Sequence, residues 1–295
     1  MRARDILAVI VMVIVAVVGQ LLRSEDAPNP RQDGPRRPAP ERYQAAPNGT
    51  LWEAETRAWL SETPAQQPRQ PGWLGTNQNS VVDIPKTRRS GTGTAFAIGP
   101  GVWLTARHGV DGCDDVGLQV APKRAIKVTD IRHHVSADLS LLRSSRAPTP
   151  ISLTTEQSDD IYMVGFPVGK PGAVHGSKLG STILRERGRY QTRERADVWA
   201  ERSRIPNRDG SLGGLSGGPA FAPNGQVYGV VLAEDRRRGR VITARPATLR
   251  TLIDASSAEI GDDPSPATFS ADLYPGKARE LILSGRVSRV LCRVR

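Results

Sequence analysis

One short stretch, residues 213–219 (GGLSGGP), limits most strongly what this chain can fold into. It sets Ser216 among glycines just ahead of an apolar segment. A serine that attacks a carbonyl carbon needs an open backbone around it, and glycine removes the Cβ atoms that would block the approach. The amides of Gly214 and Ser216 would then face one side of a tight turn and could hold an oxyanion. Taken alone, the run is also compatible with a glycine-rich loop that carries an incidental serine.

Two other motifs share this appearance, and the rest of the chain argues against both. No lysine follows the glycines, so the charge that grips phosphate in a nucleotide-binding loop is missing. Residues 214–218 also fit the Gly-x-Ser-x-Gly elbow of the α/β-hydrolases, but those enzymes place their histidine after the serine. No histidine follows Ser216. A catalytic base must therefore come from upstream, where the histidines are His108, His133, His134 and His175.

The first half of the chain offers a histidine and an aspartate in suitable settings. Residues 92–98 and 102–106 are strand-like and are joined by a Gly-Pro-Gly turn, which predicts a hairpin. His108 follows its second strand, where a rigid scaffold can hold a functional side chain. Asp138 stands among apolar residues, and a buried carboxylate needs a donor beside it, such as an imidazole N–H. In isolation, Asp138 is better explained as a turn aspartate before a strand, which needs no partner.

In chain order, three segments resemble the trypsin-like serine peptidases, the chymotrypsin-fold family: residues 105–108 (TARH), 137–142 (ADLSLL) and 214–219 (GLSGGP). The order His, Asp, Ser is that of this family and not of the subtilisins or the α/β-hydrolases. The resemblance covers roughly residues 88–255. It implies an all-β fold of two antiparallel six-stranded Greek-key β-barrels with a C-terminal helix, expected at residues 246–255.

The resemblance also implies a role for each matching residue. Ser216 would be the nucleophile, His108 the general base and later acid, and Asp138 the group that fixes the imidazole tautomer. The amides of Gly214 and Ser216 would form the oxyanion hole. The expected activity is a serine endopeptidase that hydrolyses protein or peptide substrates through an acyl-enzyme, without a cofactor. The alternatives are a catalytically inactive binding module that keeps the barrels and a basic membrane-associated scaffold protein.

Two positions depart from the family pattern. Many members carry an aspartate before the serine that receives a new N-terminus after zymogen cleavage, and here that residue is Leu215. Activation through that ion pair is therefore not expected. In this family, the residue six positions before the serine often sets the charge of the substrate pocket, and here it is Gly210, which carries no charge. Asp209, next to it, and Glu234 are therefore the candidates for an acidic pocket that accepts Arg or Lys.

The N-terminal region differs from the rest in composition. Residues 6–18 form an unbroken apolar run that follows two arginines and extends to residue 22 if Gly19 and Gln20 are tolerated. The length of this segment overlaps that of a short transmembrane helix and that of a secretion signal. An uncleaved anchor is expected, with a cleaved signal as the alternative. The catalytic domain should then lie outside the cytoplasm, periplasmic or extracellular, and be secreted if cleavage occurs.

These features together predict four segments. They are a signal-anchor or transmembrane segment at 1–22, a Pro/Arg-rich, largely disordered tether at 23–85, the peptidase domain at 86–255 and a C-terminal extension at 256–295. Within the peptidase domain, the first barrel is expected at about 86–148 and the second at about 149–255.

Charge and cysteine content add two further expectations. The formal net charge is +11, but the arginines are spread along the chain without an aromatic-basic platform. No nucleic-acid partner is therefore expected. The basic surface is instead expected to be attracted to anionic lipid headgroups. Cys113 and Cys292 lack metal-ligand spacing, so no metal site is expected. In an oxidising compartment they would pair and fasten the tail to the first barrel, and in the cytosol they would stay free thiols.

Overall fold

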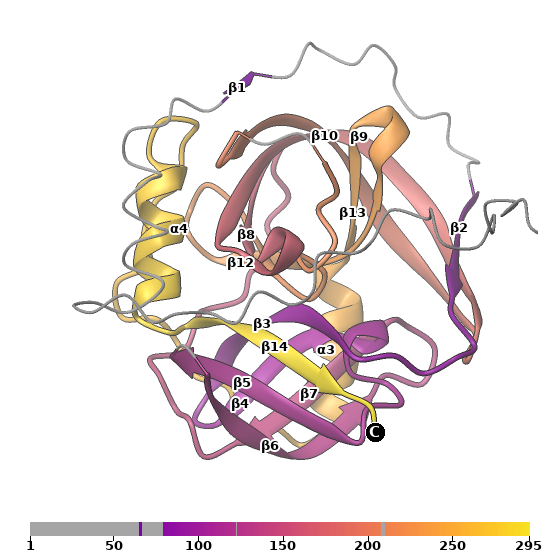
Figure 1. The fold of residues 1–295 in the computed structure, drawn as a ribbon. Coiled ribbons are helices and arrows are strands. Elements are labelled where there is room, and N and C mark those ends of the chain that lie inside the picture. Colours follow the sequence, from indigo (N-terminus) through magenta and orange to yellow (C-terminus); the bar gives the residue numbers. More distant parts are fainter. Residues whose placement is uncertain (1–64, 67–78, 122, 208–209) are drawn as a thin grey trace, which may run out of the picture. The chain divides into compact units, whose positions relative to one another are not determined.

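The computed structural model describes residues 65–66, 79–121, 123–207 and 210–295, which all belong to one unit, Ala45–Arg295 (Figure 1). The predicted anchor at 1–22 and nearly all of the predicted tether at 23–85 lie outside the described residues. Within the described residues, no helix combines the length and the apolar character that a membrane crossing requires.

Six strands close into an antiparallel barrel in the order β14-β3-β4-β7-β6-β5. Their bounds are β3 (Gly91–Gly99), β4 (Val102–Ala106), β5 (Asp115–Ala121), β6 (Arg124–His133), β7 (Leu139–Ser144) and β14 (Val287–Arg293). The predicted hairpin at 92–98 and 102–106 is confirmed as β3 and β4, which pair antiparallel. Apolar side chains such as Trp103, Leu118 and Val290 fill the barrel and are fully buried.

The sixth strand of this first barrel comes from the far end of the chain. β14 pairs antiparallel with β3 on one side and β5 on the other, and Figure 1 shows it as a yellow arrow among the indigo and magenta strands. The segment predicted for the first barrel, about 86–148, holds only the other five strands. Without β14, β3 and β5 would present unpaired edges to solvent. The predicted disulfide Cys113–Cys292 is present, with a Cα–Cα distance of 5.5 Å.

The remaining strands form an eight-stranded sheet in the order β1-β10-β13-β12-β11-β8-β9-β2. They are β1 (Ala65–Gln66), β2 (Asn79–Ile84), β8 (Asp160–Gly165), β9 (Gly172–Gly188), β10 (Thr192–Ile205), β11 (Pro219–Phe221), β12 (Val227–Asp235) and β13 (Arg240–Ala244). β9 also pairs with β10, so the six strands from β8 to β13 make a ring. The all-β prediction is therefore confirmed, with one closed barrel and one ring-like sheet. β2 runs parallel to β9, unlike the expected antiparallel arrangement.

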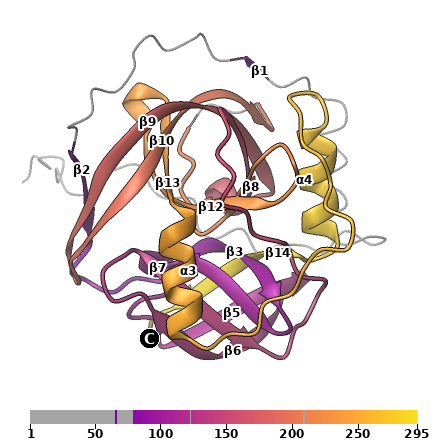
Figure 2. The ribbon, with the colours of Figure 1, turned by 180° about the vertical axis from the view of Figure 1, so that it is seen from behind.

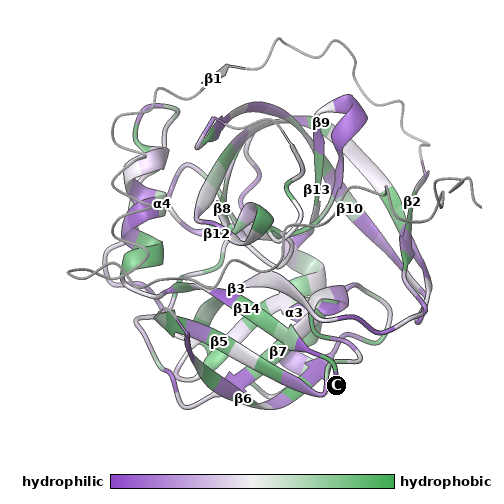
Figure 3. Ribbon diagram, viewed as in Figure 1, coloured by the Kyte–Doolittle hydropathy of each residue, from purple (hydrophilic) through white to green (hydrophobic). Residues whose placement is uncertain are grey.

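In the part of the chain that the structure describes, two α-helices accompany the strands. α3 (Pro246–Ala255) confirms the predicted closing helix, begins at a proline and lies against β7 and β12, strands of both β-structures (Figure 2). α4 (Tyr274–Leu283) was not predicted, because only a C-terminal extension without assigned elements was expected at 256–295. The structure instead has a helix followed by β14. Figure 3 shows polar and apolar residues together on α4, as expected for a helix that buries one face.

Candidate active site

His108 and Asp138 meet at one edge of the first barrel. His108 lies in a short 3₁₀ helix, Arg107–Gly109, directly after β4, and Asp138 directly precedes β7. Because Ala106 of β4 is paired with Leu139 of β7, the residues that flank this pair come together. The His108 Nδ1–H lies 2.6 Å from Asp138 Oδ2, and the backbone N–H of His108 donates to Oδ1 at 2.8 Å.

The Asp138 carboxylate is only 2 % exposed, but it has hydrogen-bond donors on both oxygens. Besides the two donors from His108, the Tyr190 hydroxyl donates to Oδ1 at 2.6 Å. Burial lowers the pKa of His108, but the charge of Asp138 and its hydrogen bond outweigh burial and raise the pKa above its ordinary value. The pair therefore favours the imidazolium that a general base becomes after taking a proton.

The turn that carries Ser216 lies against the strands that lead to His108. The Ser216 carbonyl accepts a hydrogen bond from the Thr94 N–H of β3 at 2.9 Å. Gly217 has a φ of +86°, and a Cβ there would come within 2.8 Å of the backbone nitrogen of Ala106. Only glycine permits this approach, so the glycine after the serine sets the distance between the turn and the end of β4.

The Ser216 hydroxyl itself donates to the Leu232 carbonyl at 3.4 Å. Among the described residues, Ser216 Oγ makes no hydrogen bond to the His108 imidazole. Catalytic hydrogen bonds are often long in the absence of substrate and tighten in the complex. The structure thus pairs His108 with Asp138 and sets the Ser216 turn beside the strand that leads to them.

The backbone around Ser216 leaves two donors available. The Gly213 carbonyl accepts a hydrogen bond from the Val168 N–H at 2.6 Å, and the Gly214 carbonyl accepts one from the Thr94 hydroxyl at 2.7 Å. Within the described part of the chain, the N–H groups of Gly214 and Ser216 donate to no acceptor. Gly214 has a φ of +99°, and a Cβ there would lie 2.5 Å from the Phe166 carbonyl oxygen. This arrangement has the donors that an oxyanion hole requires.

The three candidates for the substrate pocket have different outcomes. Asp209 lies outside the described residues. Gly210 is described, and its carbonyl accepts a hydrogen bond from Arg204 at 3.1 Å. The carboxylate of Glu234 on β12 accepts hydrogen bonds from the Ser211 hydroxyl and from the Leu212 N–H, the latter at 2.9 Å. Glu234 therefore bridges β12 and the segment that leads to Ser216.

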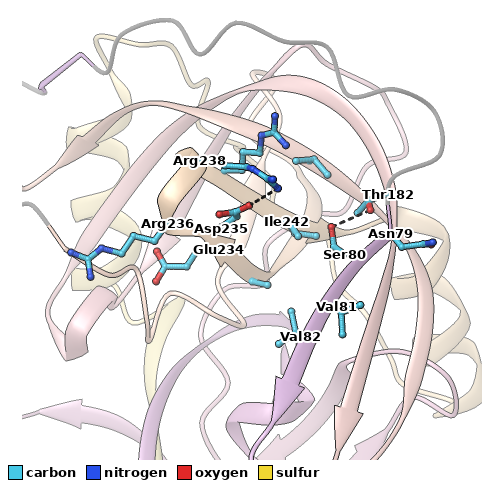
Figure 4. A pocket seen from close by; sticks show the side chains of 13 residues that line it. Asn79, Ser80, Val81, Val82, Thr182, Glu234, Asp235, Arg236, Arg238 and Ile242 are labelled. Carbon is cyan, nitrogen blue, oxygen red and sulfur yellow. Dashed lines mark hydrogen bonds and ion pairs between the residues drawn. The ribbon is translucent and has the colours of Figure 1, made fainter.

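Two cavities lie next to these residues. His108 lines a cavity of about 380 Å³ together with Leu232 and Glu234. A second cavity, of about 360 Å³, also contains Glu234, and Figure 4 shows it between side chains of β2 and the end of β12. Val82, Ala233 and Glu234 line both cavities. The two cavities therefore adjoin, and hollow surface extends from His108 along β2 and the end of β12.

Three further residues at this site were not predicted, and all come from the hairpin of β9 and β10. They are Tyr190, Glu186 and Glu194. Oε1 of Glu194 accepts the Asp138 N–H at 2.8 Å, and Glu186 accepts the Thr192 hydroxyl. The sequence contains a pattern that could have revealed the two glutamates. Residues 185–187 and 193–195 both read Arg-Glu-Arg, and on a strand such alternation points each glutamate to the face opposite its two arginines.

Both glutamates hold their protons more tightly than usual. Burial, reinforced by the charge of Asp138, raises the pKa of Glu186 to about 7. Burial also raises the pKa of Glu194 to about 8, against the hydrogen bond from the Asp138 N–H. Among the described residues, no group of three or more His, Cys, Asp or Glu side chains is arranged to hold a metal ion.

The segment that carries His108, Asp138 and Ser216 is similar to known peptidases. Residues 93–230 match the family model described as the trypsin-like peptidase domain, and this range includes His108, Asp138 and Ser216. Two curated relatives, serine proteases Rv3671c and MT3772 from two strains of Mycobacterium tuberculosis, are each 27% identical over 185 residues. That alignment covers 58% of this chain and 45% of each relative, so the chain spans less than half of their length.

Solved structures show more distant likeness. The active form of the Rv3671c protease from M. tuberculosis has 21% identity and a TM-score of 0.47, over 61% of this chain and 76% of that one. The HtrA-type protease AlgW with a decapeptide has 17% identity and a TM-score of 0.42, over 58% and 52%.

Proposed function

Because residues 93–230 match the trypsin-like peptidase domain, we propose that this chain is a serine endopeptidase that cleaves protein or peptide substrates through an acyl-enzyme. The observation that carries the proposal is the hydrogen-bonded pair of His108 and Asp138 beside the Ser216 turn. The hydrogen bond to Asp138 keeps the proton on Nδ1 of His108, which leaves Nε2 free to act as a base.

The proposed reaction uses each of these groups in turn. Ser216 Oγ attacks the scissile carbonyl carbon while His108 Nε2 takes its proton. The carbonyl oxygen becomes an oxyanion, which accepts hydrogen bonds from the N–H groups of Gly214 and Ser216. The C–N bond then breaks as His108 gives the proton to the leaving amine. A water molecule, deprotonated by His108, hydrolyses the acyl-enzyme and restores the serine.

One observation favours a second candidate, a binding module that keeps the fold without catalysis: the Ser216 hydroxyl is bonded to the Leu232 carbonyl and not to His108. Hydrolysis of a peptide library by the purified full chain separates the two. We expect Ser216→Ala and His108→Ala each to lower kcat by about four orders of magnitude or more. The control is Ser265→Ala, which removes an exposed hydroxyl outside residues 93–230 and should leave kcat unchanged. Equal, negligible hydrolysis by the wild type and all variants would favour the binding module.

We further propose that the catalytic domain works outside the cytoplasm, either held to the membrane by residues 6–22 or secreted. The disulfide Cys113–Cys292 supports an oxidising compartment. Cell fractionation with N-terminal sequencing of the mature chain tests this: an intact N-terminus in the membrane fraction indicates the anchor, and a shortened soluble chain indicates secretion. An intact chain in the cytosol with two alkylatable thiols would contradict both.

A further inference from the structure

We propose that Tyr190 is a positioning residue for this reaction, and the inference rests on the proposed peptidase function. The turn between β9 and β10 extends from the ring-like sheet to the first barrel and fixes the carboxylate that orients His108. Asp138 and His108 both belong to the first barrel, so the donor from the other β-structure links the two halves of the site.

The contacts of the Asp138 carboxylate show what Tyr190 contributes. Oδ2 interacts with the His108 Nδ1–H at 2.6 Å, and Oδ1 accepts the His108 backbone N–H at 2.8 Å and the Tyr190 hydroxyl at 2.6 Å. Without Tyr190, both remaining donors belong to His108 itself. Tyr190 is therefore the carboxylate's one independent hydrogen-bond donor within the described residues.

Tyr190 is itself held in place. The guanidinium of Arg107, the residue before His108, lies 4.0 Å from the centre of the Tyr190 ring. Arg189, the neighbour of Tyr190, forms an ion pair with Asp111, and Asp111 also pairs with Arg107. A cation above the ring and an ion pair at the preceding residue thus attach the hairpin turn to the segment that carries His108.

The surrounding charges explain why Asp138 needs this donor. Glu186 and Glu194 lie close enough for their charges and that of Asp138 to disfavour one another. Carboxylates that share a buried site disfavour one another's charge, and the charge of Asp138 is what stabilises the His108 cation. The Tyr190 hydroxyl stabilises the ionised form. Burial, with the adjacent charge of Asp138, raises the pKa of Tyr190 far above its ordinary value, so the hydroxyl stays protonated and remains a donor.

Tyr190→Phe is the sharpest test, because it keeps the ring over Arg107 and removes only the hydroxyl. We expect kcat to fall by about 10- to 100-fold, the range for a hydrogen bond to a charged group, with little change in KM. We also expect the acidic limb of the pH profile of kcat/KM to move to higher pH. Without the hydroxyl dipole, the potential at His108 is more negative, so His108 holds its proton to a higher pH.

The matched control is Tyr228→Phe, which removes another buried tyrosine–aspartate bond, from the Tyr228 hydroxyl to Asp197 Oδ2 at 2.7 Å. This variant should lose thermal stability without a shift of the acidic limb. The pKa of His108, measured by NMR titration of its ring protons, gives a readout that needs no turnover, and it should rise in Tyr190→Phe. An unshifted His108 pKa in a folded Tyr190→Phe would overturn the positioning role. Absence of turnover in the wild type would overturn the proposed function instead.

Discussion

The two β-structures of this molecule are stabilised by different interactions. The first barrel has an apolar interior, is closed by a strand from the chain terminus and is fastened by the disulfide Cys113–Cys292. The ring-like sheet carries most of the buried carboxylates among the described residues: Glu186, Glu194, Asp197 and Glu201 lie on β9 and β10, and Asp138 alone belongs to the first barrel.

The difference indicates a division of labour. Covalent and apolar closure holds His108 and Asp138 on a stiff support, whereas the ring-like sheet supplies the groups whose charge or hydrogen bonding can vary. The turn with Ser216 and the hairpin with Tyr190 both come from the ring-like sheet. Apart from His108 and Asp138 themselves, substitutions in the first barrel should therefore act mainly on stability. Substitutions around these two turns should act mainly on rate and pH dependence.

Outside His108, Asp138 and Ser216 themselves, the largest effect should come from Gly214→Ala, which alters the backbone of the Ser216 turn. A Cβ at this position would clash with the Phe166 carbonyl, and the φ of +99° strains any residue but glycine. The N–H of residue 214 would move, and loss of one oxyanion donor lowers kcat by about 100- to 1,000-fold. Steady-state kinetics measure this. Gly276→Ala, with open space around the added Cβ on α4, is the control, and equal kcat in both variants would contradict the proposed oxyanion hole.

Removal of the disulfide tests whether the first barrel acts mainly as a stable support. The double variant Cys113→Ser/Cys292→Ser opens a link between residues 179 positions apart, and it should lower the free energy of unfolding by about 3–5 kcal/mol. Urea denaturation of the folded protein measures the loss. At a temperature where the variant stays folded, kcat should be close to that of the wild type. A large loss of kcat in a fully folded variant would show that the first barrel is not merely a support.

Glu194→Gln should change how stability depends on pH. The folded-state pKa of Glu194 is raised from 4.5 to about 8, so the folded state holds a proton that the unfolded state releases between these values. The contribution of Glu194 to the free energy of unfolding is therefore fully present below about pH 4.5, and it is lost as the pH rises to about 8. The Tm of the variant should therefore fall less between pH 5 and 8, in buffers of roughly constant ionic strength. Glu280→Gln, at an exposed site on α4, should keep the wild-type slope.

The smallest effect should come from Glu186→Gln. The negative charge of Glu186 raises the pKa of His108, so its removal should move the acidic limb of kcat/KM to lower pH by about one unit or less. This direction is opposite to that expected for Tyr190→Phe. If both variants shift the limb in the same direction, the electrostatic account of the hairpin is wrong.

Local patterns in the sequence predicted part of this molecule well. Strand propensity and the Gly-Pro-Gly turn fixed the β3–β4 hairpin, and a proline at the helix start marked α3. The contact between His108 and Asp138 was expected from motifs that match a known family, and the structure forms it. These features depend on neighbours in the chain or on short motifs, which a sequence displays directly.

Other features depend on contacts between distant segments. β14 pairs with strands nearly two hundred residues earlier, and β2 runs parallel to β9. Neither pairing leaves a local signature, because strand propensity does not specify a partner. Tyr190 was missed for the same reason: only the length of β9 and β10 brings their turn to Asp138. The membrane anchor and the acidic substrate pocket stay predictions.

The most direct test of the proposed chemistry is the site at which a fluorophosphonate probe attaches to the full chain, mapped by mass spectrometry. A serine is phosphonylated by such a probe only when a neighbouring base activates it. We expect one adduct, on Ser216, and strongly reduced labelling in His108→Ala. An unlabelled wild-type protein, or labelling of Ser216 that does not depend on His108, would contradict the joint action of these two residues.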